Sequence, residues 1–164
     1  MKIVCFLIDE YQKKILKSNF ENITVSNEPL NTKNINLFFD ADIIVSRARG
    51  IKLKFVEKIL KKFCNLKLIC SMSSGFDHID LEYCKKNNIS VSNVPSYAES
   101  SVAEYTFAFI LAISRKILTS LKPINSKFNY NNLTGFELDG KTLGVIGSGK
   151  IGLKLIKIAK GFEM

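Results

Sequence analysis

Short apolar runs alternate with longer amphipathic segments along the first half of the chain. Strands are predicted at 2–8, 23–25, 42–46, 66–70 and 89–94. Helices are predicted between them at 11–20, 54–63 and 81–87, where apolar residues recur at helical spacing. This alternation is typical of an α/β fold, in which helices pack on the faces of a sheet.

The pattern changes at Pro95, because proline cannot continue a central strand. A long helix is predicted to begin within 96–101 and to span 101–118. It is apolar nearly all round, so we expect burial on several sides, for example between two domains or in a subunit interface. The polar stretch 122–138 is predicted to be a surface connection. We therefore divide the chain into domains 1–95 and 96–164.

The strongest motif lies at 141–161, KTLGVIGSGKIGLKLIKIAKG. It predicts a strand at 142–146, a turn GSGKIG at 147–152 and then a helix, which is the setting that a dinucleotide-binding GxGxxG requires. Gly147 would allow the tight turn, Gly149 would let the backbone approach a pyrophosphate, and Gly152 would let helix and strand pack closely. The alternative is a glycine-rich turn that binds nothing. The predicted cofactor site consists of Gly147, Ser148, Gly149, Lys150, Ile151 and Gly152.

An acidic residue that binds the adenosine ribose is expected roughly 20 residues after these glycines, which is past Met164. These residues therefore do not distinguish NAD from NADP; NAD is the expected cofactor, and NADP is left open.

Composition narrows the function classes. The chain has 164 residues, 46% of them apolar, with a net charge of +9, which suits a packed globular protein. Only three of its 24 basic residues are arginines, and its lysines fall at the polar ends of predicted helices, which argues against a nucleic-acid ligand. The longest apolar stretch, 105–113, is too short to span a membrane, and the N-terminus is interpreted as a first strand, so we expect a cytoplasmic protein.

The four cysteines, Cys5, Cys64, Cys70 and Cys84, form no CxxC pair and lie in or beside apolar segments. They are interpreted as core thiols, with metal or redox roles as the alternative. No metal site is predicted.

Several stretches resemble the D-isomer-specific 2-hydroxyacid dehydrogenase family in order: LKLICSMSSGFDHIDLEYCKKNNISVSNVPSYAESSVAEY, LTGFELDGKTLGVIGSGKIG and KLIKIAKGFEM. The resemblance covers 66–164, and LTGF with GKIG is most similar to the D-lactate dehydrogenase branch. It implies a flavodoxin-like substrate lobe followed by the truncated start of a Rossmann NAD-binding lobe. It also implies a small 2-hydroxy or 2-oxo acid substrate, with D-lactate or pyruvate as the example from the most similar branch, and a homodimer.

The same resemblance implies roles for individual residues. Ser74 and Gly75 match the loop whose backbone amides receive the substrate carboxylate, although a simple turn is the alternative. Tyr97 matches a position near the substrate, or is a packed hinge aromatic. Val102 matches a nicotinamide-facing position, or belongs to the core. His78 is the only histidine, and a capping or surface role is expected for it in place of catalysis.

The family's catalytic His, Glu and Arg would lie beyond Met164, and none of Arg47, Arg49 and Arg115 falls in a matching motif. No catalytic residue is therefore assigned. Two interpretations follow. In the first, the chain is about the N-terminal half of an NAD-dependent dehydrogenase, and this half is inactive by itself. In the second, it is a non-catalytic family member that retains at most dinucleotide or partner binding. The apolar face of the last predicted helix and the edge of the strand before it have no partner within 1–164. We therefore also predict that the isolated chain is poorly soluble or oligomeric.

Overall fold

The computed structural model describes residues 1–46, 55–121 and 132–164, which separate into two compact units, Met1–Tyr97 and Ala98–Met164. Each unit is described by itself. Arg47, Arg49 and the first part of the predicted 122–138 connection lie outside the described residues.

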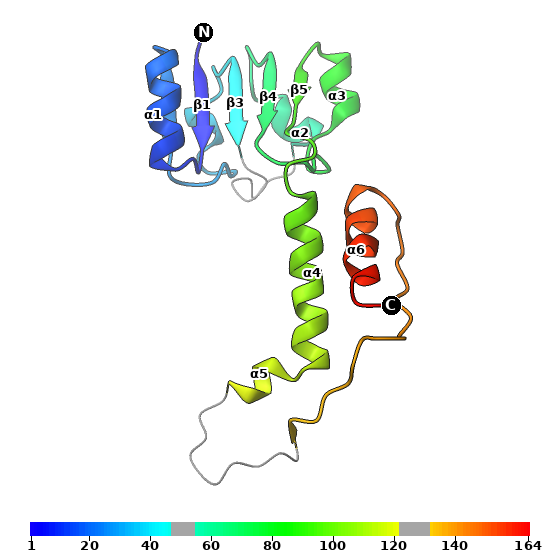
Figure 1. The fold of residues 1–164 in the computed structure, drawn as a ribbon. Helices are drawn as coiled ribbons and strands as arrows, with labels where there is room; N and C mark the ends of the chain where they lie inside the picture. Colours follow the sequence, from blue (N-terminus) through cyan, green and yellow to red (C-terminus); the bar gives the residue numbers. More distant parts are fainter. Residues whose placement is uncertain (47–54, 122–131) are drawn as a thin grey trace. The chain divides into compact units, whose positions relative to one another are not determined.

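The first unit is built on a parallel sheet. Its strands are β1 (Ile3–Phe6), β2 (Ile23–Ser26), β3 (Ile43–Ser46), β4 (Leu68–Ser71) and β5 (Ser90–Ser92). They are ordered β2-β1-β3-β4-β5, and each neighbouring pair is parallel (Figure 1). This is the flavodoxin-like strand order, so the predicted α/β class is confirmed.

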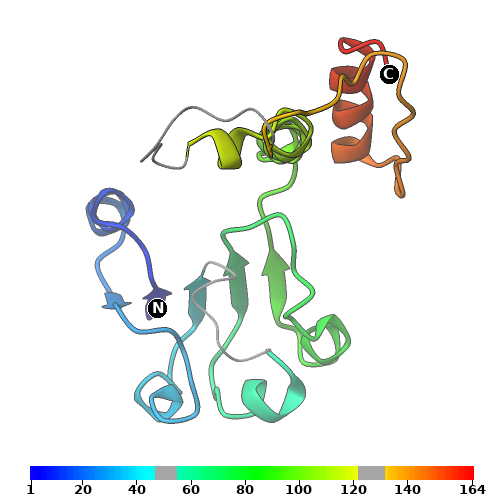
Figure 2. The same ribbon diagram turned by 90° about the horizontal axis from the view of Figure 1, so that it is seen from below.

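Helices cover both faces of this sheet (Figure 2). They are α1 (Glu10–Asn19), the 3-10 helix η1 (Ile35–Leu37), α2 (Glu57–Leu60) and α3 (Leu81–Lys86). Side chains alternate along β1: Ile3 and Cys5 pack with Leu16 of α1, whereas Val4 and Phe6 join the larger core beneath η1, α2 and α3. Two hydrophobic layers therefore hold the sheet, and its strands end at a common carboxyl edge.

The helix predicted at 54–63 is shorter in the structure, where α2 has only four residues. Phe55 instead pairs with Ile79 in an isolated parallel bridge. The Phe55 N–H donates to the His78 carbonyl at 2.6 Å, and the Asp80 N–H donates to the Phe55 carbonyl at 2.8 Å. These bonds hold Phe55 extended, so the helix begins only after it.

The second unit contains α4 (Glu99–Ser114), α5 (Ile117–Ser120) and α6 (Lys150–Lys160), and α4 packs along α6 (Figure 1). The single helix predicted at 101–118 is therefore wrong, because it breaks at Lys116, whose φ is +55°. The Ser114 carbonyl accepts the N–H of Phe136 at 2.9 Å. The returning chain thus binds the carbonyl at the helix end.

The core of the second unit is formed by Phe107, Leu138 and Ala159, which are all buried. The Phe107 ring also lies 4.7 Å from that of Phe162, measured between centroids. Leu138 is the last residue of the segment predicted as a surface connection. Because Leu138 is buried, the prediction is wrong at this residue. An apolar anchor at this point fixes where the chain returns toward α6.

The strand predicted at 142–146 does not form among the described residues of the second unit. A strand requires a neighbouring strand with which to exchange backbone hydrogen bonds, and no described segment pairs with this one. The side chain of Ile146 is fully exposed, at 105% of its reference area. The sequence pattern identified an apolar segment correctly, but its pairing partner is not among the described residues.

The cysteine prediction is partly wrong. Cys5 and Cys84 are buried and Cys70 is half-buried, but Cys64 is exposed. It lies just after α2, where its N–H donates to the Phe39 carbonyl at 3.0 Å. Burial raises the pKa of the Cys5 thiol to about 11, and the nearby Cys70 thiol adds to the effect.

Among the described helices, none has the length and apolar character needed to cross a bilayer.

Candidate functional site

Ser74 and Gly75 lie in the loop that follows β4, at the carboxyl edge of the sheet. Open α/β sheets bind ligands outside the carboxyl ends of their strands. Both residues are exposed, while Ser71 at the end of β4 is 3% exposed. The loop therefore stands on a buried strand end and faces outward.

Hydrogen bonds tie this loop to the segment after β5. The Val94 N–H donates to the Ser73 carbonyl at 3.1 Å, and the Ser74 hydroxyl donates to the Val94 carbonyl at 3.1 Å. The Asn93 amide nitrogen Nδ2 donates to the Ser74 carbonyl at 2.8 Å. Two loops distant in sequence are thus held together by three bonds.

A second group of bonds closes the loop from inside. The Ser73 hydroxyl donates to the Gly75 carbonyl at 2.8 Å and lies 2.7 Å from the Ser71 hydroxyl. The carbonyls of Ser73, Ser74 and Gly75 are consequently all occupied. Among the described residues, the N–H groups of Ser74 and Gly75 donate to no acceptor. Successive free N–H groups at an exposed turn suit an anion such as a carboxylate.

The sequence did not single out Asn93, Ser71 or Ser73. The signal was present, because β4 and β5 each end in a serine, polar residues come soon after (Ser73 and Ser74 after β4, Asn93 after β5), and the ends of neighbouring parallel strands meet at one edge. Tyr97, the last residue of the first unit, is 63% exposed. It is not part of the hydrophobic core of its unit.

His78 neither caps a helix nor lies fully on the surface, contrary to the sequence interpretation. The N-cap of α3 is Asp80, whose side chain accepts the Tyr83 N–H at 2.9 Å. The imidazole is half-buried beside the Phe55 ring, and its Nε2 atom is buried with no hydrogen-bond partner among the described residues. Burial lowers the pKa of His78, and the nearby Asp77 carboxylate opposes part of the shift.

In the second unit, the glycines of the 147–152 turn are in different environments. Gly147 has φ +94°, a conformation that glycine adopts without strain. A Cβ added to Gly149 would meet nothing within 4 Å, whereas one added to Gly152 would overlap the Gly147 carbonyl oxygen. The turn therefore needs glycine at 147 for its direction and at 152 for its packing, and it leaves open space at 149.

The turn leads directly into α6. Gly149 is its N-cap, so no side chain at this position caps the first turn of α6. Phosphates bind at such helix N-termini. Lys150 forms an ion pair with Glu99 of α4, with Nζ and Oε1 3.5 Å apart. The side chains of Ile151 and of Val102 in α4 are each partly exposed, at 44% and 41%.

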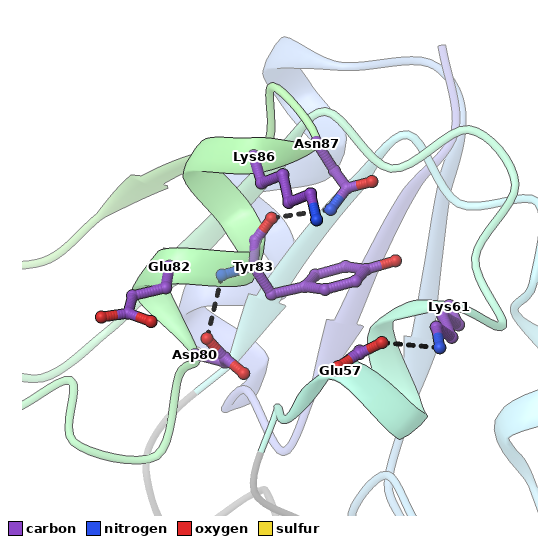
Figure 3. Close-up of a pocket in the computed structure, with 7 residues that line it drawn as sticks. All are labelled: Glu57, Lys61, Asp80, Glu82, Tyr83, Lys86 and Asn87. Atoms are coloured by element: carbon purple, nitrogen blue, oxygen red, sulfur yellow. Dashed lines mark hydrogen bonds and ion pairs between the residues drawn. The ribbon is translucent and has the colours of Figure 1, made fainter.

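A separate hollow of about 420 Å³ lies between α2 and α3 in the first unit (Figure 3). Figure 3 shows its lining, Glu57, Lys61, Asp80, Glu82, Tyr83, Lys86 and Asn87. Its polar groups largely bind one another: the Lys61 ammonium lies 2.6 Å from the Glu57 carboxylate, and the Asn87 amide donates to the Tyr83 carbonyl at 2.9 Å. It contains no residue predicted from the sequence, and its groups serve the local structure.

Comparison with known proteins identifies the class. Residues 3–150 match the catalytic domain of D-isomer specific 2-hydroxyacid dehydrogenases. The chain therefore belongs to this family, whose named members are oxidoreductases.

The relatives cover several activities. An aromatic 2-oxoacid reductase of Clostridium sporogenes is 42% identical over 110 residues, covering 66% of this chain and 33% of that protein. The D-lactate dehydrogenase of Escherichia coli is 38% identical over 106 residues, covering 64% of this chain and 32% of that enzyme. The structure of Aquifex aeolicus D-lactate dehydrogenase, complexed with NAD and lactic acid, matches with TM-score 0.85 and 31% identity, covering 99% of this chain and 49% of that one. The matches thus span from about a third to about half of the length of these relatives.

Proposed function

We propose that this chain supplies about the N-terminal half of an NAD-dependent dehydrogenase that transfers hydride between nicotinamide and C2 of a D-2-hydroxy acid or 2-oxo acid. In this proposal Met1–Tyr97 is the substrate lobe and Ala98–Met164 begins the dinucleotide-binding lobe. The observation that carries it is the turn at 147–152, because its positive φ at Gly147, open space at Gly149 and close packing at Gly152 together suit a pyrophosphate.

The chain's own residues would bind and orient the reactants. The backbone N–H groups of the 147–152 turn and the N-terminus of α6 would hold the phosphates, with the Lys150 side chain beside them. The N–H groups of Ser74 and Gly75 would bind the substrate carboxylate, with Tyr97 near the substrate and Val102 facing the nicotinamide. When bound, NAD supplies the hydride acceptor. We assign no acid or base in this chain, so the complete reaction requires residues from the other half of the family fold.

NADH binding tests the cofactor site directly. The chain is titrated with NADH by calorimetry, beside Gly149→Val and the matched control Gly144→Val. Gly144, like Gly149, has open space around its Cβ position, but it lies before the turn. We expect Gly149→Val to abolish binding and Gly144→Val to retain it. Equal NADH affinity in all three proteins would refute the site.

A fusion tests the reaction and the substrate class. The chain is joined to the part of the Aquifex aeolicus D-lactate dehydrogenase that it does not cover, and NADH oxidation is followed with pyruvate and with phenylpyruvate. Turnover of either acid supports the dehydrogenase proposal, and the ratio distinguishes a lactate-type from an aromatic-type enzyme. A fusion that folds and binds NADH but turns over neither acid would favour the non-catalytic alternative.

We also propose that the protein acts as a homodimer. Tyr105, Phe109 and Ile113 follow one another along one side of α4, at 66%, 49% and 64% exposure, away from the buried Ala103 and Phe107. Tyr105 and Phe109 pack edge to face, 4.7 Å between ring centroids. Aromatic side chains of this kind are enriched in protein interfaces.

A further inference from the structure

The conformation of the 73–75 loop is determined by what its carbonyls bind. All peptide bonds among the described residues are trans, so the C=O of each residue and the N–H of the next point in opposite directions within one plane. The partner that fixes a carbonyl therefore also fixes the direction of the following N–H.

Three consecutive peptide planes are held in this way. The Val94 N–H binds the Ser73 carbonyl, the Asn93 amide binds the Ser74 carbonyl, and the Ser73 hydroxyl binds the Gly75 carbonyl. The middle plane carries the Gly75 N–H. Its carbonyl is bound by a side chain from the segment after β5, whereas the Gly75 carbonyl accepts from the hydroxyls of Ser73 and, at 3.4 Å, of Ser71.

We propose that Asn93 is a positioning residue for the substrate carboxylate: its amide keeps the Ser74 carbonyl turned inward, so that the Gly75 N–H faces the ligand. This inference rests on the proposed function, since it takes the Ser74–Gly75 loop to be the carboxylate site. Asn93 does not itself touch the substrate.

The physical need for such a residue follows from Gly75. Glycine has no Cβ, so the Ser74–Gly75 peptide can rotate at little steric cost, and the Cβ position of Gly75 has only the Asp77 carboxylate oxygen near it, at 3.5 Å. If the plane turned over, the Ser74 carbonyl oxygen would face the anion in place of an N–H donor. A donor at position 93 prevents this, whereas an acceptor would favour it.

The test measures oxamate, an unreactive 2-oxo acid analogue, binding to the 164-residue chain by shifts of the Ser74, Gly75 and Phe76 amide resonances. The variants are Asn93→Ala and Asn93→Asp. The Asn87→Asp variant is the matched control, because Asn87 makes the same type of bond, from Nδ2 to the Tyr83 carbonyl at 2.9 Å, away from the loop.

We expect both Asn93 variants to bind oxamate at least tenfold more weakly, with Asn93→Asp the weaker, and Asn87→Asp to bind like the parent. NADH affinity should be unchanged in all of them, since the 147–152 turn belongs to the other unit. A general loss of structure would lower both affinities, so this pair of measurements separates positioning from folding.

Each of three results would overturn the inference. Oxamate binding equal to the parent in both Asn93 variants would refute the role of Asn93 and leave the carboxylate site standing. No response of the loop amides in the parent chain would refute the site itself, and the inference with it. As a measurement that needs no variant, the Gly75 amide of the parent should be as ordered on the ps–ns timescale as β4, and a flexible Gly75 would also overturn the inference.

Discussion

The two units present similar apolar segments in different surroundings. The segment LKLIC at 66–70 contributes three residues to β4 (Leu68–Ser71), because β3 and β5 lie beside it and pair with it. Its residue Ile69 is only 1% exposed. The segment KTLGVI at 141–146 also carries three strand-forming apolar residues, Leu143, Val145 and Ile146, yet it pairs with no described segment and leaves Ile146 fully exposed. An apolar run thus specifies the tendency to form a strand, while the neighbouring strands decide whether it forms.

The largest expected effect contrasts the two segments directly. Ile44 in β3 is fully buried, so Ile44→Ala should lower the free energy of unfolding of the first unit by about 2–5 kcal/mol. Ile146→Ala removes an exposed side chain and should change stability by less than about 0.5 kcal/mol. Urea unfolding followed by circular dichroism measures both. A comparable loss in Ile146→Ala would mean that 141–146 is packed in solution.

The glycine turn allows a sharper comparison within the second unit. A Cβ at Gly152 overlaps the Gly147 carbonyl oxygen, so Gly152→Ala should destabilise this unit by about 1–3 kcal/mol without any ligand. Gly149→Ala enters open space and should change stability by less than about 0.5 kcal/mol. Thermal unfolding of the two variants without NADH measures this difference. A lower unfolding temperature for Gly149→Ala than for Gly152→Ala would contradict this prediction.

Association provides the next test, because α4 exposes three large apolar side chains at successive turns, Tyr105, Phe109 and Ile113, whereas α1 exposes two, Tyr11 and Ile15. Phe109→Glu should weaken self-association about tenfold or more, as expected for an aromatic residue at the centre of an interface. Tyr11→Glu, at an exposed aromatic residue of the first unit, is the control and should leave association unchanged. Sedimentation velocity over a range of concentrations measures both. An unaffected Phe109→Glu would remove this side of α4 from the proposed dimer.

The smallest expected effect concerns pH. Burial lowers the pKa of His78 below its usual 6.5, so folding favours the neutral imidazole. This contribution to stability is complete above pH 6.5 and is lost as the pH falls through the lowered pKa. His78→Phe keeps a ring beside Phe55 and cannot titrate. Its stability relative to the parent should therefore improve as the pH is lowered from 7 to 5, which urea unfolding at each pH measures.

Most elements of the first unit could be predicted because their signals are local. Asp9 precedes α1 and accepts the Gln12 N–H in a capping box, and the Asp80 side chain caps α3 by accepting the Tyr83 N–H. The short α2 could not be predicted, because Phe55 pairs with Ile79, which is far away in the sequence. The end of α4 likewise depends on Phe136, whose N–H binds the Ser114 carbonyl.

The sequence by itself determined the α/β class, the family resemblance and the positions of the Ser74–Gly75 and 147–152 loops, since these depend on periodicity and on glycine within short motifs. Only the tertiary structure decided that Asn93 binds the Ser74 carbonyl, that His78 is half-buried and that Cys64 is exposed. Such contacts join residues through the fold, and a linear pattern does not record which strand ends meet. The same physical reason explains why residues 141–146 have a strand-like sequence but no strand: hydrogen bonds between strands require a second segment.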